Sequence, residues 1–226
     1  ALVAPRASDG TLAYHALIVA RTGSGIGAVA DLKGKTVAIV AGDSLGARRM
    51  QLAGLLAEGN DPAQLFGAVL TVGSAEEGVR MVAAGSADAA FAWSSLSGAP
   101  ENGYSRGTLT DLVAQGEVEM SRIAVIWHSP AIAHSPFAVL QAVPEDDKSR
   151  IERFMLSLAT AHPEACDVLN PFYAGGYATV DAADYSGLAV IASREDDALA
   201  LPEAPARTGT ATEPIAPVLD TATEPV

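Results

Sequence analysis

Short apolar runs rich in β-branched residues alternate with helix-forming segments along this chain, and this alternation limits its fold more than any other feature. The strands that we expect are residues 14–21, 36–41 and 68–72, a stretch that ends near Trp93, and residues 121–127. The helices that we expect run from about Leu45 to Glu58, from Ser74 to about Ala84, and over residues 144–162. Alternating strands and helices predict a mostly parallel sheet that is covered on both faces. The sequence therefore predicts an α/β fold.

The length and net charge of the chain limit the classes of protein to which it can belong. The 226 residues, of which 49% are hydrophobic, are enough for one large domain or two small domains with cores of their own. The formal net charge of -13 argues against a nucleic-acid partner, for which a basic surface is expected. It does not exclude a small anionic ligand, because a phosphate group senses the few donors around it and salt screens more distant charges over about 8 Å.

No segment of the sequence resembles a membrane anchor or a targeting signal. No run approaches the roughly 18 uncharged apolar residues of a membrane span, and the first residues lack the charged-then-apolar layout of a signal peptide. We therefore expect no direct membrane span, and either the removal of a leader or a start inside a longer protein. Cys166 is the single cysteine, so we expect no intrachain disulfide and no thiol-metal cluster. We also expect no other metal site and no cofactor.

The C-terminal segment, residues 196–226, differs in composition from the rest of the chain. It repeats the sequence TATEP at residues 210–214 and 221–225, among further prolines and acidic residues. Because the segment lacks apolar periodicity, we expect it to be a linker or a disordered extension.

Residues 42–46, Gly-Asp-Ser-Leu-Gly, connect an expected strand to an expected helix. They match the G-x-S-x-G motif that exposes a nucleophilic serine in many hydrolases. A serine nucleophile also needs a histidine base that is oriented by an acid. Ser44, Asp88 and His128 occur in the chain order of α/β-hydrolases, but the HGGG-type oxyanion loop and the Asp-x-x-His pair of GDSL esterases are missing. A Ser44-dependent serine hydrolase is therefore an alternative and not the main interpretation.

The same turn suits the binding of an anion. The first N–H groups of a helix lack partners within the helix, and the helix dipole adds partial positive charge there. Small residues let a phosphate or phosphonate approach these groups, as at Ser44-Leu45-Gly46 and at Ser74. N-capping without any ligand is the alternative for both serines, and Ser74 with Glu77 has the sequence of a capping box.

Other residues beside these turns bear on a possible ligand. Trp93 and Ser94 end an expected strand, and α/β folds place ligands at strand ends. A core aromatic residue beside a turn serine is the alternative for this pair. The carboxylates of Asp43, Glu76 and Glu77 oppose a bare dianion, unless they face away from it or accept from an amine or hydroxyl of the ligand.

Four segments, taken in order, resemble one family. Residues 29–50 look like the Asp-Leu-Lys-Gly-Lys strand-helix unit of periplasmic binding proteins for phosphonate, phosphite or phosphate, the solute receptors of ABC importers. Residues 73–93 resemble the next helix and strand of that family. The Trp-x-Ser-Pro sequence with its second proline, within residues 122–139, resembles the return segment, and residues 175–188 resemble the closing segment. The ordered likeness covers about residues 11–190.

This resemblance implies a type II periplasmic-binding-protein fold, in which two lobes with mostly parallel sheets are joined by two hinge crossings. Lobe two would comprise residues 22–130, and residues 1–21 and 131–195 would form part of lobe one. Family members usually begin with a strand-helix-strand portion of lobe one. We therefore expect the first lobe to be incomplete and the chain to be a fragment.

The resemblance also implies the residues of the site. The ligand-gripping Ser-Thr-Ser turn of the family falls on Ser44-Leu45-Gly46, where only the first hydroxyl survives. The Ser-His-Asp turn of the phosphonate binders falls on residues 74–76, where Ala75 replaces the histidine, and the acid-bearing turn falls on residues 93–94. Ser44 with the N–H groups of Leu45 and Gly46 would bind ligand oxygens, Ser74 would be a second donor, and Trp93 with Ser94 would line the opposite wall.

The function that the resemblance implies is the capture of a small phosphorus oxyanion without chemistry. The partners would be a small anionic ligand and the membrane permease of an ABC transporter, in the periplasm or at a cell surface through a segment outside this sequence. Because two hydroxyl donors and a histidine are missing, a larger or less charged oxyanion or an organic phosphate ester is as reasonable as a phosphonate. An enzyme or sensor domain built on the same fold is the alternative.

Overall fold

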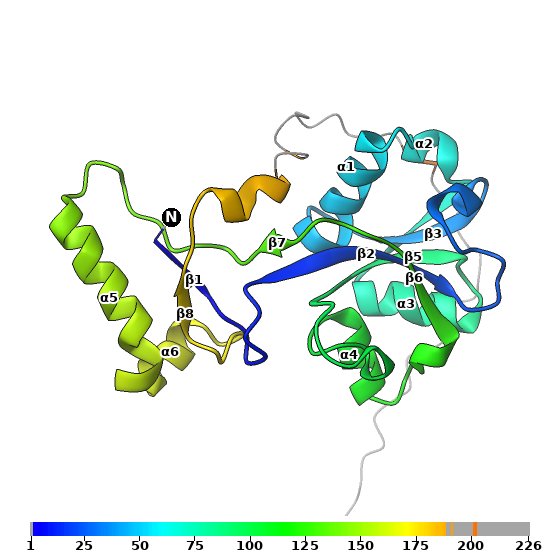
Figure 1. Cartoon of the computed structure of the whole chain (residues 1–226). Helices are drawn as coiled ribbons and strands as arrows, with labels where there is room; N and C mark the ends of the chain where they lie inside the picture. Colours follow the sequence, from blue (N-terminus) through cyan, green and yellow to red (C-terminus); the bar gives the residue numbers. More distant parts are fainter. Residues whose placement is uncertain (1, 189–190, 192–200, 203–226) are drawn as a thin grey trace, which may run out of the picture.

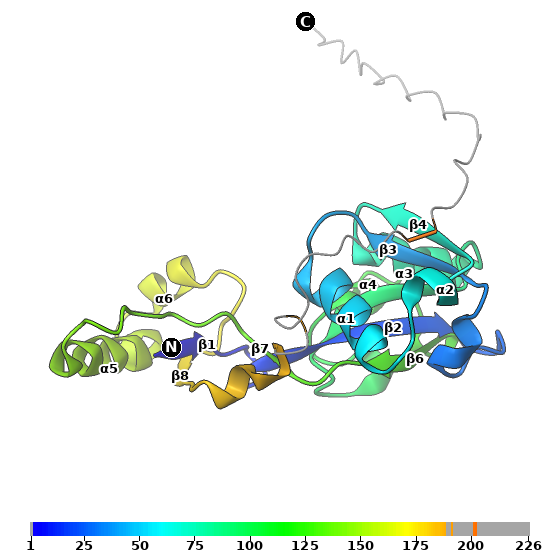
Figure 2. The same cartoon turned by 90° about the horizontal axis from the view of Figure 1, so that it is seen from above.

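The computed structural model describes residues 2–188, Ile191, Leu201 and Pro202. In this part of the chain, two bodies of unequal size lie side by side (Figure 1). The view from above shows that β1, β2 and β7 lie along the connection between the bodies (Figure 2). The strands that the alternating sequence pattern predicts lie in the larger body.

The described strands of the larger body form one sheet. These strands are β2 (Ala13–Arg21), β3 (Thr36–Val40), β4 (Ala68–Val72), β5 (Ala89–Ser94), β6 (Ile123–His128) and the short β7 (Ile132–Ala133). Their order is β4-β3-β5-β2-β6, and β7 pairs with the start of β2. β3 runs parallel to β4 and β5, whereas β2 runs antiparallel to β5 and β6. The predicted α/β fold with a mostly parallel sheet is confirmed, with β2 as an antiparallel strand inside it.

Helices cover both faces of this sheet, as predicted. A π-helical turn, η2 (Leu45–Arg49), continues into α1 (Met50–Ala57), and α2 (Pro62–Leu65) follows near it. The opposite face carries α3 (Ala75–Ala84) and α4 (Thr108–Ala114) (Figure 1). The short 3-10 helices of the described chain are η1 (Val29–Leu32), η3 (Pro100–Asn102), η4 (Met120–Arg122) and η5 (Ala183–Leu188).

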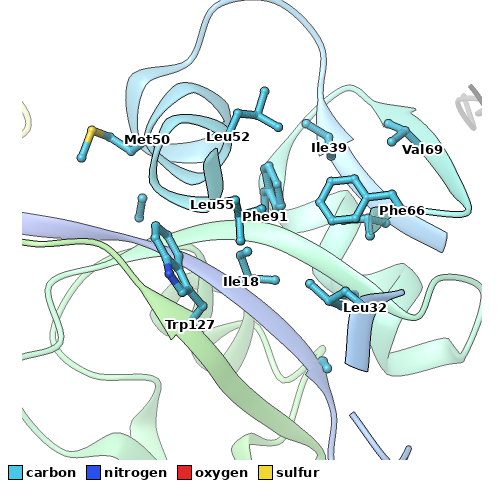
Figure 3. Packing of buried hydrophobic residues seen from close by; sticks show 14 of the residues in the cluster. Ile18, Leu32, Ile39, Met50, Leu52, Leu55, Phe66, Val69, Phe91 and Trp127 are labelled. Carbon is cyan, nitrogen blue, oxygen red and sulfur yellow. The ribbon is translucent and has the colours of Figure 1, made fainter. Parts of the chain in front are cut away.

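Alternate residues of the central strands supply two separate cores. Ile18 and Phe91 face α1 and pack with Leu55 and Trp127 (Figure 3). The residues next to these in the sequence, such as Leu17, point to the opposite face of the sheet and pack with α3 and α4. Because side chains alternate along a strand and both faces are covered, these strands read as nearly continuous apolar runs.

The smaller body is built around two paired strands. β1 (Val3–Pro5) pairs antiparallel with β8 (Tyr177–Thr179). Helix α5 (Glu145–Ala161) packs against this pair, and α6 (Pro163–Leu169) packs against α5. Its small core contains Val3, Met155, Leu158, Cys166 and Tyr177. Several large apolar side chains of this body are exposed: Leu140, Phe154, Val168, Leu169 and Phe172. An incomplete first lobe would leave such a surface, and the incompleteness itself stays a prediction.

The boundaries between the lobes also stay a proposal. The structure shows that β2, which falls within residues 1–21, lies inside the larger sheet, between β5 and β6. Most of the C-terminal segment 196–226 lies outside the described residues. Within it, the Pro202 carbonyl accepts a hydrogen bond from the Val69 N–H of strand β4, and Leu201 packs against the core beneath α1. In the described part of the chain, no helix is long and apolar enough to cross a membrane.

Candidate functional site

The sequence-predicted site residues follow strands that end at one edge of the larger sheet. Ser44 follows β3, Ser74 follows β4, and Trp93 and Ser94 end β5. Because these three strands are parallel, their carboxyl ends meet at the same edge. β2 runs the other way, so its first residues, including Tyr14, lie at this edge as well.

The turn at Ser44 is a capped helix start. Ser44 is half-buried, and its Oγ accepts a hydrogen bond of 3.2 Å from the Ala47 N–H. As the first helical residues, Leu45 and Gly46 have no intrahelical acceptors for their N–H groups. Gly46 lies against Tyr14, because a Cβ built on Gly46 would lie 2.6 Å from the Tyr14 Cε2 atom. The Ser44 hydroxyl is therefore a capping group, beside two N–H groups that are not used within the helix.

A buried glutamine holds this turn in place. The Gln51 Nε2 group donates to the carbonyls of Gly46 (2.9 Å), Ala92 (2.9 Å) and Leu17 (3.1 Å). These carbonyls belong to η2, β5 and β2, and Gln51 is fully buried between them. Gln51 thus fixes the position of the Ser44 turn relative to the ends of two strands.

The other predicted serines also serve their own turns. The Ser74 Oγ accepts from the Glu77 N–H at 3.2 Å, while the Glu77 carboxylate accepts from the Gly73 N–H at 2.8 Å. In the expected capping box, the Glu77 carboxylate would accept from the N–H of Ser74 itself. It accepts instead from the N–H of Gly73, one residue earlier. Ser94 is fully buried, and its Oγ accepts from the Leu96 N–H at 3.1 Å.

Two of the three acids that oppose an anion, Asp43 and Glu77, have partners of their own. Asp43 forms an ion pair with Arg49, with 3.4 Å between the Arg49 Nε and a carboxylate oxygen. The Glu77 carboxylate is held by the Gly73 N–H. Both carboxylates therefore have partners of their own.

Sequence reasoning identified Trp93 but missed the side chains around it at this sheet edge. We name this group the arginine cluster: Tyr14, Trp93, Arg106, His134 and Tyr173. The Arg106 guanidinium carbon lies 4.6 Å from the ring centre of Tyr173 and 5.7 Å from that of Trp93. Trp93 in turn meets Tyr14 edge to face, with 5.6 Å between ring centres. Trp93 and Arg106 belong to the larger body, whereas Tyr173 belongs to the smaller one. The arginine cluster therefore bridges the two bodies.

His134 has a defined protonation state in this cluster. Its Nδ1 atom lies 2.8 Å from the Pro5 carbonyl oxygen, which only accepts, so Nδ1 carries the hydrogen. Burial lowers the pKa of His134, and the nearby charge of Arg106 lowers it further, against the effect of the Pro5 hydrogen bond. The ring is therefore neutral at neutral pH, and its Nε2 accepts from the Arg106 Nη1 at 3.4 Å.

A second contact joins the bodies beside the cluster. The Asp9 carboxylate accepts from the Ser105 hydroxyl and from the Thr11 N–H and hydroxyl. The Ser105 Oγ also lies 2.8 Å from the Ser95 Oγ. Partial desolvation raises the pKa of Asp9, but the hydrogen bonds from Ser105 and Thr11 and the charge of Arg106 lower it on balance. Asp9 is thus an ionised carboxylate that is already bound by donors.

The serine hydrolase interpretation fails on geometry. Asp88 accepts from the Thr36 N–H at 2.8 Å, at the start of β3, whereas Ser44 follows the end of the same strand. The two side chains therefore lie at opposite edges of the sheet, and the triad with His128 is not assembled. Among the described residues, no group of histidine, cysteine, aspartate and glutamate side chains is arranged to hold a metal ion.

Comparison with known proteins identifies the family. A family model described as "ABC transporter, phosphonate, periplasmic substrate-binding protein" matches residues 1–185. This chain belongs to that family. The phosphonate-binding family consists of periplasmic substrate-binding proteins and not of enzymes, which agrees with the failure of the hydrolase geometry.

Solved structures share the fold at low identity. XAC2383 from Xanthomonas citri, bound to chloride, matches with a TM-score of 0.61 and 17% identity, over 85% of this chain and 68% of that one. A phosphonate-transporter binding protein from Pseudomonas aeruginosa matches with a TM-score of 0.53 and 17% identity, over 81% of this chain and 58% of that one. PhnD1 from Prochlorococcus marinus, in complex with methylphosphonate, matches with a TM-score of 0.52 and 16% identity, over 85% of this chain and 70% of that one. These matches support the type II periplasmic-binding fold.

Proposed function

We propose that this chain is the ligand-capturing receptor of an ABC importer and that its ligand is a small phosphorus oxyanion. The observation that carries the proposal is the convergence, at one sheet edge, of a helix start whose first N–H groups have no acceptor within the helix and an arginine that bridges the two bodies. Both features supply donors to negative oxygens and neither supplies a nucleophile. The receptor therefore binds and delivers its ligand unchanged.

In this proposal, the N–H groups of Leu45 and Gly46 bind ligand oxygens beside the Ser44 hydroxyl. A serine Oγ that accepts from a backbone N–H still carries its own hydrogen, so Ser44 caps the helix and donates to the ligand at once. Ser74 supplies a second hydroxyl in the same way. Trp93 forms the opposite wall, and Ser94 supports the turn behind it, since its side chain is buried.

The ligands of related proteins support an anion. PhnD1 is solved with methylphosphonate, and XAC2383 is solved with ATP as well as with chloride. These ligands range from a bare ion to a phosphate ester. Because Leu45 and Gly46 lack the hydroxyl donors that the resemblance implies at these positions, a phosphate ester is included in the proposed ligand class.

Delivery follows from the two-body architecture. A ligand bound between the bodies stabilises their closed arrangement, and a permease distinguishes loaded from empty receptor by that difference in shape. We propose that the partner is the membrane permease of an ABC transporter. We further propose that the receptor works in the periplasm, either free or attached to the cell surface through a segment outside this sequence.

The proposal is tested by calorimetric titration of the full chain with phosphate, phosphite, methylphosphonate and AMP, together with thermal unfolding. Ligand at 100 times its Kd stabilises the folded state by about 2.7 kcal/mol. We expect Ser44→Ala to weaken the binding of the tightest ligand about fivefold, since one neutral hydrogen bond contributes about 1 kcal/mol. Ser157→Ala, on the outer side of α5, is the matched control. Absence of binding for all four compounds would refute the proposed ligand class.

A further inference from the structure

The backbone around Arg106 is fixed against the end of β5. The Ser95 N–H donates to the Arg106 carbonyl at 3.0 Å, and Gly107 pairs with Ser94. Gly107 has a φ of 121°, and a Cβ at this position would lie 2.4 Å from the Trp93 carbonyl oxygen. Only glycine fits there, so the arginine side chain starts from a defined point at the sheet edge.

The guanidinium group is also fixed. The ring faces of Trp93 and Tyr173 cover it at distances typical of cation–π contacts. Its Nη1 group points to the neutral Nε2 atom of His134, whose ring is itself held by the Pro5 carbonyl. An arginine held in this way keeps its planar fork in one orientation and loses little further freedom when it binds a ligand.

Among the described residues, no direct partner neutralises the positive charge of Arg106. Within the described residues, Arg106 makes no ion pair, although the charges of Asp9 and Asp111 are felt nearby. The Asp9 carboxylate is bound instead by Ser105 and Thr11. The described hydrogen bonds use one of the five guanidinium N–H groups, and the aromatic rings do not accept the in-plane donors.

We propose, on the basis of the proposed function, that Arg106 is the residue that recognises the charge of the ligand, by donating from the edge of its guanidinium to two oxygens of a phosphate, phosphonate or phosphate-ester group. A rigid fork with free in-plane donors matches two oxygens of a tetrahedral anion, and such charge-assisted bonds are about twice as strong as neutral ones. Arg106 thereby replaces the donors that are missing at positions 45, 46 and 75.

A purely structural role for Arg106 makes a different prediction. If the guanidinium only joined the two bodies through Trp93 and Tyr173, its replacement would change stability and leave charge selectivity unaltered. If it binds the ligand, its replacement lowers both the affinity and the dependence of the affinity on salt, because salt screens the interaction between the charges.

The test is calorimetric titration of the full chain and its Arg106→Gln and Arg106→Lys variants with phosphate, methylphosphonate and AMP, at low and at high sodium chloride. Arg153→Gln is the matched control, because it removes one positive charge from α5, away from the arginine cluster. Circular dichroism of each ligand-free variant verifies the fold.

We expect Arg106→Gln to raise the Kd of the tightest probe at least about tenfold, which corresponds to about 1.4 kcal/mol, and to flatten its salt dependence. Arg106→Lys keeps the charge but not the fork, so it retains the salt dependence with an intermediate Kd. The inference is overturned if Arg106→Gln binds within about twofold of the wild type with the same salt dependence. If the wild type binds none of the probes, the proposed function itself fails, and the two failures are thus distinguished.

Discussion

Replacement of the buried Gln51 by methionine tests how the Ser44 turn is held at the sheet edge. Methionine keeps the length and approximate volume of the side chain, so the change removes hydrogen bonds without creating a large cavity. The carbonyls of Gly46, Ala92 and Leu17 lose their shared donor. The Gln51 amide has two N–H groups for these three carbonyls, so two hydrogen bonds are lost, and each costs about 1.5 kcal/mol because its buried acceptor is left without a donor.

One effect acts in the opposite direction. The Gln51 Oε1 atom is buried without a hydrogen-bond partner among the described residues, so its removal recovers about 1 kcal/mol. We therefore expect Gln51→Met to lower the free energy of unfolding by about 2 kcal/mol. This loss reduces the ratio of folded to unfolded protein roughly 30-fold.

Urea denaturation followed by tryptophan fluorescence measures this change, because both tryptophans, Trp93 and Trp127, lie in the larger body. With an m-value of about 2 kcal/mol/M, the midpoint should fall by about 1 M. Gln64→Met is the matched control, since the exposed Gln64 side chain donates only to the Asp61 carboxylate among the described hydrogen bonds. A midpoint for Gln51→Met equal to that of the control would refute the structural role assigned to Gln51.

Three further changes have defined outcomes. Gly46→Ala brings a Cβ within 2.6 Å of Tyr14, so we expect a destabilisation of about 1–3 kcal/mol in urea denaturation, and a variant as stable as the wild type would contradict that contact. Burial lowers the pKa of His134 below its ordinary value of 6.5, so protonation favours the unfolded chain. Its contribution to stability is present above pH 6.5 and is lost as the pH falls through the lowered pKa, and His134→Phe should lose this part of the acid dependence when unfolding is measured across that range. Glu58→Ala removes the acceptor of the Trp127 Nε1–H and should cost about 1–2 kcal/mol, with a shift in tryptophan emission as the check.

The sequence predicted the local elements well where one physical signal dominated. The expected strand 68–72 is β4, and the helix expected from Ser74 to Ala84 is α3 with Ser74 as its N-cap. Apolar runs and capping residues act over a few neighbouring positions, so they are legible without knowledge of the fold. The ordered motifs also indicated the correct family, because they preserve the spacing of several such elements at once.

The sequence did not predict the parts of the site that depend on distant contacts. Arg106 lies in a loop whose sequence matches no motif. No sequence pattern near Arg106, Tyr173 or His134 indicates that these three residues are neighbours. The reversed direction of β2 brings Tyr14 to the carboxyl ends of the parallel strands, and the return of the chain brings His134 beside Arg106. A strand-helix pattern fixes which segments fold locally, whereas the pairing of strands and the meeting of two bodies depend on interactions between residues far apart in the chain.

Main-chain donors at residues 45–46 follow from the local sequence, because a helix that starts after a strand always leaves its first N–H groups without internal acceptors. The position of the Arg106 charge does not follow from the local sequence. Only the tertiary structure places a guanidinium between aromatic rings from both bodies, since that arrangement is stabilised by packing across the connection and by no local preference of residue 106.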